Sequence, residues 1–498
     1  MKRNLKLKFI WGVVWLMGLS FFSEAQITLT IEQALDIAED NNPQMKSAKL
    51  NLERTRYSLE AQRAALKPQF SMNVSPISYS QTRSFDNRYS EWYTNKSLGS
   101  SGTFRTSLPI LLTDGTLSLV DEFGWQDRTS MNQNGENRNK AFANDLSIRY
   151  TQPIFTYNRL KMQLQRLEFD HENSGISYAL QRLTMESSIT SQFYQVYMTQ
   201  KELEISRDQY ENAKKDYEII KEKVEADLSA REELFQADVN LATAESSVES
   251  NIVRLENAKD GLKQTLGIPL NEEINVIADV AITPIMIDQE KAIHSGLTSR
   301  MELRQREIDI AESDLQMITV KAMNEFRGDI SLSIGITGDN QRFEDIYKQP
   351  TQSPRVGITF TVPIFDWGEK RARIRAQETS QTVAKLNYEN LKVNFELSIR
   401  QTIRRIGNLL TQISIREKNV LNAQQTYELN QIRYREGDLT GMQMSLIQVQ
   451  LSNARISLEQ ALIDYKNELL NLKIITLYDF EKDKPIVPVR ELPVNTQR

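Results

Sequence analysis

The sequence has no cysteine and only two histidines, His171 and His294. The absence of cysteine excludes disulfides, thiol nucleophiles, Cys-ligated zinc and the N-terminal acylation of lipoproteins. Neither histidine has a second metal ligand at helical or strand spacing, so we interpret both as ordinary polar residues. No Gly-x-Ser-x-Gly motif occurs, which disfavours an exported hydrolase. We therefore expect no catalytic residue, no metal and no cofactor.

Two further features are missing: a block rich in Lys and Arg, and, beyond the N-terminus, any run of 18 apolar residues. With a net charge of −5, the chain is a poor candidate for nucleic-acid binding. Any membrane crossing by the later chain must use strands, because backbone groups in lipid have to be paired. The 498 residues indicate two or more structural units.

The N-terminus has the pattern of a secretory signal. A basic region that includes Lys2 and Arg3 precedes the apolar run 9–22, and Ser23-Glu24-Ala25 offers a cleavage site before Gln26. The alternative is a membrane anchor. The run is 14 residues long, which is short of the roughly 20 that a spanning helix needs. We predict export and removal of residues 1–25.

The hydrophobic period of the mature chain alternates between helix and strand, and the order of elements occurs twice. The first set is a helix (31–66, interrupted at Asn42-Pro43), a strand (70–75), a polar stretch (76–143), a strand (146–151) and two helical stretches (156–226 and up to 266). The second set is a helix (291–327), a strand (330–337), a polar loop (339–354), a strand (356–362), a long helix to 436 and a return helix to 477. A hairpin within the polar stretch, with strands 103–112 and 116–123, is left open.

Matching landmarks indicate an internal duplication. Pro153-Ile154-Phe155 corresponds to Pro363-Ile364-Phe365 at a shift of 210 residues, and Asp227-Leu228-Ser229 corresponds to Asp438-Leu439-Thr440 at 211. The repeat is too long for a solenoid unit and indicates two fused halves. The predicted division is a signal peptide (1–25), a first repeat (26–267), a linker (268–290), a second repeat (291–477) and a C-terminal tail (478–498).

The number of strands bears on assembly. Two alternating strands per half give about four, too few to close a barrel with an interior, and strands in lipid cannot leave an open edge. Copies of the chain must therefore combine their strands. A helix of about 70 residues is about 105 Å long, and the shorter helices stacked end to end would match it. This suits a tall helical cylinder below a barrel.

These residues resemble the outer-membrane efflux protein family, whose best-known member is TolC. The resemblance covers nearly all of 27–480 and rests on Ala34-Leu35 with Asn42-Pro43, on the two Pro-Ile-Phe junctions and on residues 433–437, Arg-Tyr-Arg-Glu-Gly. It implies a mainly α protein: a homotrimer whose 12-stranded membrane β-barrel stands on a periplasmic α-helical barrel. It also implies an outer-membrane exit duct for efflux or type I secretion in a Gram-negative bacterium, working with a periplasmic adaptor and an inner-membrane pump.

Two groups of candidate functional residues follow. The breaks between the paired long helices are expected to form the periplasmic mouth and to contact the adaptor. They comprise Asp227, Leu228, Ser229, Tyr434, Gly437, Asp438, Leu439 and Thr440. The strand-to-helix junctions, with aromatic residues suited to a membrane interface, comprise Pro153, Phe155, Pro363 and Phe365.

An alternative is a structural coiled-coil protein such as a periplasmic adaptor, which would share the signal and the long helices. The strands flanked by helices disfavour it, because an adaptor has a compact domain of sequential strands. The pair Glu232-Glu233 is interpreted as a solvated helix face rather than a metal site. The sequence leaves open the exported substrate, the particular pump and the residues that hold a closed state.

Overall fold

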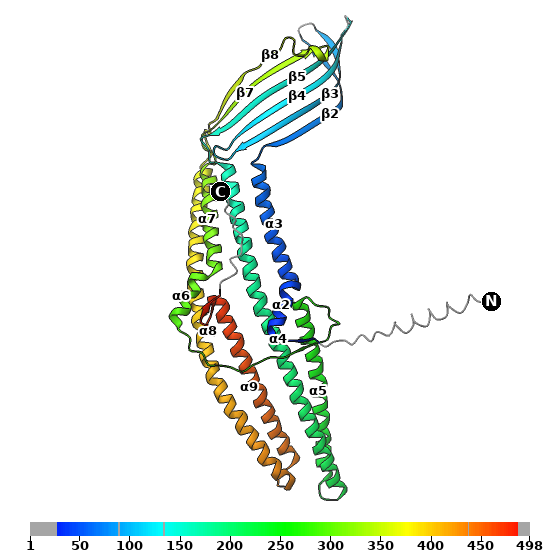
Figure 1. The fold of residues 1–498 in the computed structure, drawn as a ribbon, viewed down its shortest axis with the longest axis vertical. Coiled ribbons are helices and arrows are strands. Elements are labelled where there is room, and N and C mark those ends of the chain that lie inside the picture. The colour runs from blue at the N-terminus through cyan, green and yellow to red at the C-terminus, as the bar shows by residue number, and fades with distance from the viewer. Residues whose placement is uncertain (1–26, 88–89, 133–134, 437, 487–498) are drawn as a thin grey trace, which may run out of the picture. The chain divides into compact units, whose positions relative to one another are not determined.

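The computed structural model describes residues 27–87, 90–132, 135–436 and 438–486, and its element order repeats along the chain. The predicted signal peptide and Gly437 lie outside the described residues. Each half passes from short helices through strands into one very long helix and a return helix (Figure 1). The chain forms two compact units, and each takes segments from both halves. The helical unit comprises Met1–Lys49, Ser177–Met301 and Lys392–Arg498, and the sheet unit comprises Leu50–Ile176 and Glu302–Leu391.

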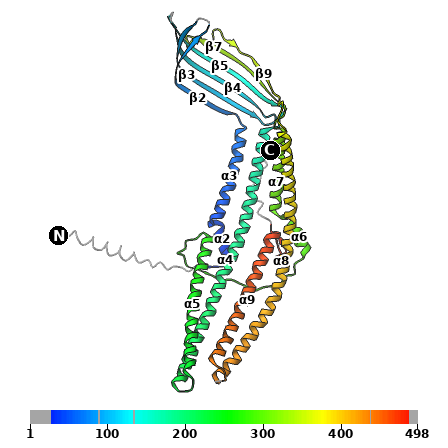
Figure 2. The same cartoon turned by 180° about the vertical axis from the view of Figure 1, so that it is seen from behind.

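The sheet unit contains one antiparallel sheet with the strand order β2-β3-β4-β5-β7-β8, and β9 also pairs with β7 (Figures 1 and 2). The strands are β2 (Gln69–Asp86), β3 (Glu91–Ile110), β4 (Gly115–Asn132), β5 (Gly135–Ile154), β7 (Arg327–Asn340), β8 (Thr351–Gln352) and β9 (Arg355–Thr361).

The first half therefore contributes four strands, and the expectation of two is wrong for this half. The hairpin left open by the sequence is present as β3 and β4, at the centre of the sheet. Its strands extend far into the polar stretch, because a strand ladder is made by backbone groups and Ser, Asn and Thr can continue it. Periodicity found only the apolar parts of each strand.

The helices are close to their predicted positions. They are α2 (Ile31–Asn41), α3 (Pro43–Ala65), α4 (Arg159–Glu225), α5 (Arg231–Leu266), α6 (Gln289–Ser299), α7 (Met301–Lys321), α8 (Glu369–Glu436) and α9 (Gly441–Thr476). With 67 and 68 residues, α4 and α8 are each about 100 Å long. In the described part of the chain, no helix combines the length and the apolar character needed to cross a membrane.

Both short helical segments are broken, at Asn42 as predicted and at Arg300, where no break was predicted. The Asn42 side chain is buried; its Oδ1 accepts from the Met45 N–H at 2.9 Å, and its Nδ2 donates to the Thr265 carbonyl at 2.7 Å. In the second half, Arg300 Nη1 donates to the Ile474 carbonyl at 3.1 Å. Each break is thus tied to the last turn of its half's return helix, α5 or α9.

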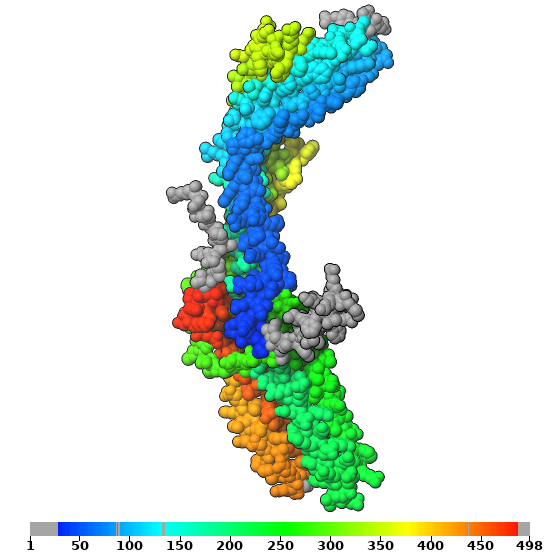
Figure 3. Space-filling view, turned by 45° about the vertical axis from the view of Figure 1, so that its right-hand side comes forward, coloured from blue at the N-terminus to red at the C-terminus, as the bar shows by residue number. Residues whose placement is uncertain are grey.

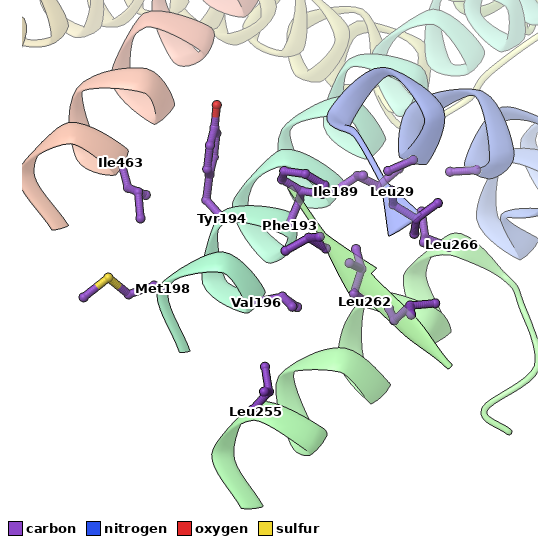
Figure 4. Close-up of a cluster of buried hydrophobic side chains, with 14 of the residues drawn as sticks. Leu29, Ile189, Phe193, Tyr194, Val196, Met198, Leu255, Leu262, Leu266 and Ile463 are labelled. Atoms are coloured by element: carbon purple, nitrogen blue, oxygen red, sulfur yellow. The ribbon is translucent and has the colours of Figure 1, made fainter. Parts of the chain in front are cut away.

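The helical unit contains two apolar cores, and the first also includes Ile463 of α9. The first lies between α2, α4 and α5 and includes Phe193, Ile189 and Leu262 (Figure 4). It is completed by the parallel pair β1 (Ile27–Leu29) and β6 (Ile274–Val276). The second core lies on α6, α8 and α9 and includes Ile399, Ile406, Tyr465 and Leu472. The tail adds a small hairpin of β10 (Tyr478–Asp479) and β11 (Lys484–Pro485).

Candidate functional site

The first hairpin tip joins α4 to α5 and contains three of the predicted residues. Asp227 has a φ of 55°, in the left-handed region that ends many helices. The Leu228 N–H donates to the Lys223 carbonyl at 2.7 Å, and Ser229 Oγ donates to Glu233 Oε2 at 2.9 Å. The Leu228 side chain is 77% exposed. A large apolar side chain is therefore presented at the end of the hairpin.

The second tip, between α8 and α9, is built in the same way. The Asp438 N–H donates to the Arg433 carbonyl at 2.9 Å, which is the bond of the first tip displaced by 210 residues. Thr440 caps α9, with a reciprocal pair of hydrogen bonds to Gln443. Leu439 is half-buried. Figure 3 shows both tips at the same end of the helical unit, in green and orange.

This equivalent hydrogen bond defines which residues of the two tips correspond, and the correspondence differs from the one that the sequence suggests. Leu228 corresponds to Asp438, and Ser229 corresponds to Leu439, whereas the similar triplets of the sequence pair Leu228 with Leu439. The same shift of 210 relates the helix ends Gly267 and Leu477, both of which have positive φ. The exposed leucine of the first tip consequently has no exact counterpart in the second.

A cleft with a volume of about 280 Å³ lies between the two hairpins, just above their tips. It is lined by Ala213, Asp216, Ile220, Glu232, Glu233, Gln236, Ala237, Asn240, Thr440, Gly441, Met442, Ser445 and Gln448. Burial raises the pKa of the Asp216 carboxyl to about 6. Next to this cleft, the predicted site residue Tyr434 is buried, and its pKa is raised to about 12 by that burial and by the carboxylates of Asp216 and Glu233.

Two polar atoms at this place are buried without a hydrogen-bond partner within the described structure: Tyr434 Oη and Gln448 Nε2. Unpaired buried polar groups are costly, so they mark a place where the two hairpins are not optimally packed. The sequence analysis did not identify Asp216. A signal existed, since Asp216 lies three residues after Ala213 and four before Ile220, on the apolar stripe of α4.

The strand-to-helix junctions differ in detail. Phe155 has a φ of 59°, and its ring centroid lies 5.3 Å from that of Phe326. In the second half, Phe365 packs edge-on against Trp367 at 4.6 Å, and both are largely exposed. Pro153 is still within β5, whereas Pro363 follows the end of β9. The junctions thus present aromatic side chains next to the first turns of α4 and α8.

The turn between β3 and β4 adds a contact that the sequence did not predict. Asp114 Oδ2 accepts from Arg159 Nε at 2.8 Å, and Oδ1 accepts from the Leu160 N–H at 3.2 Å. A carboxylate at a helix N-terminus is stabilised by the unpaired N–H groups and by the helix dipole. The hairpin is therefore fixed to the start of α4.

One face of the sheet is apolar from β2 to β9. Directly paired residues share a face, and the register places Met72, Phe104, Asp121, Leu146 and Ile336 in one row, with Phe70, Thr106, Leu119, Ile148 and Ile334 in the next. Most of these apolar side chains are well exposed. The Asp121 carboxylate accepts from Asn144 Nδ2 at 2.7 Å. A broad exposed apolar surface on a sheet marks contact with lipid or protein.

No group of three or more His, Asp or Glu side chains in the described ranges is arranged to hold a metal ion. The arrangement instead combines long paired helices with a sheet that has one apolar and one polar face.

Comparison with solved structures identifies this fold as that of bacterial outer-membrane channels. The Campylobacter jejuni CmeC outer membrane channel matches with a TM-score of 0.68 at 16% identity, over 92% of this chain and 86% of that one. VceC of Vibrio cholerae matches with 0.64 at 12% identity, over 92% and 96%. The open state of the Neisseria gonorrhoeae MtrE channel matches with 0.64 at 12% identity, over 91% and 90%.

The sequence also matches a family model over part of its length. Residues 325–476 match the model described as outer membrane efflux protein, and the resemblance is confirmed over this segment. A search of curated proteins finds no match. The family and the structures of this fold are channels rather than enzymes.

Proposed function

We propose that this protein is an outer-membrane exit duct in which several copies close one β-barrel above a helical tunnel, as part of a tripartite efflux or type I secretion system. The observation that carries the proposal is the sheet: it has a lipid-compatible face, and within the described residues it ends in the unpaired edges of β2 and β9. In lipid, each unpaired backbone group costs several kcal/mol, so the two edges must pair with neighbouring copies.

The number of strands in each chain sets the size of the proposed barrel. Six main strands per chain, β2, β3, β4, β5, β7 and β9, make 18 in a trimer, rather than the 12 that the family resemblance implied. Barrels of 16–18 strands are wide enough to leave an aqueous channel. Native mass spectrometry in mild detergent is expected to find trimers, and the trimers are expected to conduct in planar bilayers. Monomers that conduct would contradict the proposal.

The other segments of the chain have proposed roles as well. Residues 1–25 direct export, 26–267 and 291–477 are the two repeats, 268–290 link them, and 478–498 form the tail. Helices α4 and α8, about 100 Å long, would cross the periplasm of a Gram-negative bacterium. The adaptor alternative is disfavoured, because the main strands of the described structure form one extended sheet.

We further propose that the two tips contact the periplasmic adaptor. Leu228 is exposed at a turn with no core of its own, so a partner surface is its expected cover. The double substitution Leu228→Glu with Leu439→Glu should abolish efflux, because a charge would be buried at the contact. Trimer formation and membrane insertion should remain intact.

The matched control is Met286→Glu, a substitution of an exposed apolar residue in the linker between the repeats. It introduces the same kind of charge away from the tips and should transport normally. A double tip variant that reaches normal membrane levels and transports like the wild type would show that the tips do not dock.

A further inference from the structure

The apolar face of the sheet is bounded by aromatic residues at two heights. On the side of the helices lie Phe155, Phe326 and Phe360, whose rings contact one another in sequence. On the other side Trp125 pairs directly with Phe142, and Phe343 packs edge-on against Phe142 at 6.0 Å. Aromatic girdles of this kind flank the lipid-facing band of membrane barrels.

The spacing of the two girdles fits a bilayer. From Phe142 in β5 to Phe155, the first residue after β5, is a distance of 13 residues, or about 44 Å at 3.4 Å per residue. With the usual strand tilt of about 45°, the vertical separation is about 31 Å, close to the roughly 30 Å of the hydrocarbon core. The girdle of Trp125 and Phe142 therefore marks the interface that lies away from the helices.

Beyond this girdle, the same face becomes cationic. The next row pairs Leu98 with Asp127 and Asp127 with Lys140, and the row after it pairs Lys96 with Thr129 and Thr129 with Arg138. By the same geometry, these rows lie about 5 Å and 10 Å above the girdle. The first row lies at the depth of the lipid headgroups, which occupy the outer 5–8 Å or so of each leaflet, and the second row lies just beyond it.

Two of the three cations, Arg138 and Lys140, are held in place by one acid, Asp127. Arg138 Nε donates to Asp127 Oδ1 at 2.9 Å, and Lys140 Nζ lies 3.7 Å from Asp127 Oδ2. The Asp127 side chain is buried, whereas both cations keep more than half of their side-chain surface exposed. Three cations and one carboxylate leave a net charge of about +2 around the Thr129 hydroxyl. In the row beyond, the charges of Arg83 and Glu136 cancel.

We propose that Lys96, Thr129, Arg138 and Lys140 bind the phosphate group of an anionic lipid in the leaflet at this girdle. The inference rests on the proposed function, because it requires the sheet to lie in a membrane. A phosphate monoester carries about −1.5 to −2 charges at pH 7, which matches the charge of the cluster. The Arg guanidinium and the Lys ammonium groups donate strong charge-assisted hydrogen bonds to phosphate oxygens. The lipid's chains would lie on the apolar band below.

The test uses the full-length trimer in mild detergent and native mass spectrometry. The probes are bisphosphorylated lipid A and the same lipid after enzymatic removal of its phosphates. The variant combines Lys96→Gln, Asp127→Asn, Arg138→Gln and Lys140→Gln, so that no buried carboxylate loses its partners. We expect the wild type to bind the phosphorylated lipid at least about 10-fold more tightly than the dephosphorylated lipid. The variant should lose that preference.

The matched control combines Arg105→Gln and Arg128→Gln. It changes the net charge by the same amount, but both arginines lie on the opposite, polar face of the sheet. The control should bind like the wild type. A second variant, Lys96→Gln alone, removes one cation without affecting the ion pairs of Asp127 and should weaken binding several-fold.

Three outcomes would overturn the proposal: a variant that binds the phosphorylated lipid like the wild type, a control that loses as much as the variant, and displacement of the lipid by millimolar inorganic phosphate. Conductance in planar bilayers separates this proposal from the proposed function. A variant that loses the lipid but conducts normally supports both, whereas a wild-type protein that never inserts refutes the channel itself.

Discussion

Replacement of Asp216 by Asn should stabilise the contact between the two helical hairpins at neutral pH. The carboxyl lies in the cleft above the tips, and burial raises its pKa from 3.8 to about 6. The folded protein therefore holds this proton more tightly than the unfolded chain does. Between about pH 4 and pH 6 stability falls as pH rises, and above about pH 6 the full cost is present.

The magnitude follows from the size of that shift. At 1.36 kcal/mol for each pKa unit, the shift corresponds to at most about 3 kcal/mol. Because the Asp216 side chain keeps some exposure, solvent screening reduces this, and we expect about 2 kcal/mol, or roughly a 30-fold change in local opening. Asparagine has nearly the same shape and no charge to desolvate, so the variant should lose this pH dependence.

Hydrogen exchange of the amides in α4 and α9 measures the opening directly. After correction for intrinsic exchange rates, wild-type amides near Asp216 should be more protected at about pH 4.5 than at about pH 7.5, and those of the variant should be equally protected at both. Asp208→Asn is the control, because Asp208 is exposed on the same helix. Equal wild-type protection at both pH values would refute the assignment, as would a pH dependence that survives in Asp216→Asn.

Three further predictions concern other parts of the chain. N-terminal sequencing of the membrane-extracted protein should begin at Gln26, and a retained Met1 would contradict the cleavage site. Asn42→Leu should destabilise the contact of α2 with α5 by about 2–3 kcal/mol, because it removes a helix cap and leaves the Thr265 carbonyl without its Nδ2 donor, as hydrogen exchange would report. Gly267→Ala should lower the thermal stability of the protein, because φ is 74° there and a Cβ would lie 2.5 Å from the Asn41 carbonyl oxygen; unchanged stability would mean that the α5 end can shift freely.

The sequence predicted most of the helices because their apolar stripes run unbroken for many turns. It also predicted the turns at both tips, because a break in such a stripe indicates a turn between two helices. The break at Arg300 was not predicted, because no Pro or Gly lies at it and the helix resumes at Met301. What holds that break is a hydrogen bond to the Ile474 carbonyl, far away in the sequence.

The strands were predicted less completely, for a related reason. Alternation is visible only where one face is apolar, so the polar ends of β3, β4 and β5 resembled a loop. The cationic cluster could not be predicted either, because it depends on strands within the polar stretch. Lys96 is far from Arg138 and Lys140 along the chain, and only the strand register brings the three residues to one face. Site residues that depend on pairing cannot be read from spacing along the chain.

The extra hairpin changes the sheet without changing the helices. The turn between β3 and β4 lies beside the first residues of α4 and is tied to them by Asp114, so the hairpin leaves and rejoins the sheet without displacing the helix. Each half still provides one long helix, a broken pair of short helices and a return helix. An inserted hairpin would therefore widen the proposed barrel by two strands per copy while the number of helices in the tunnel stays the same.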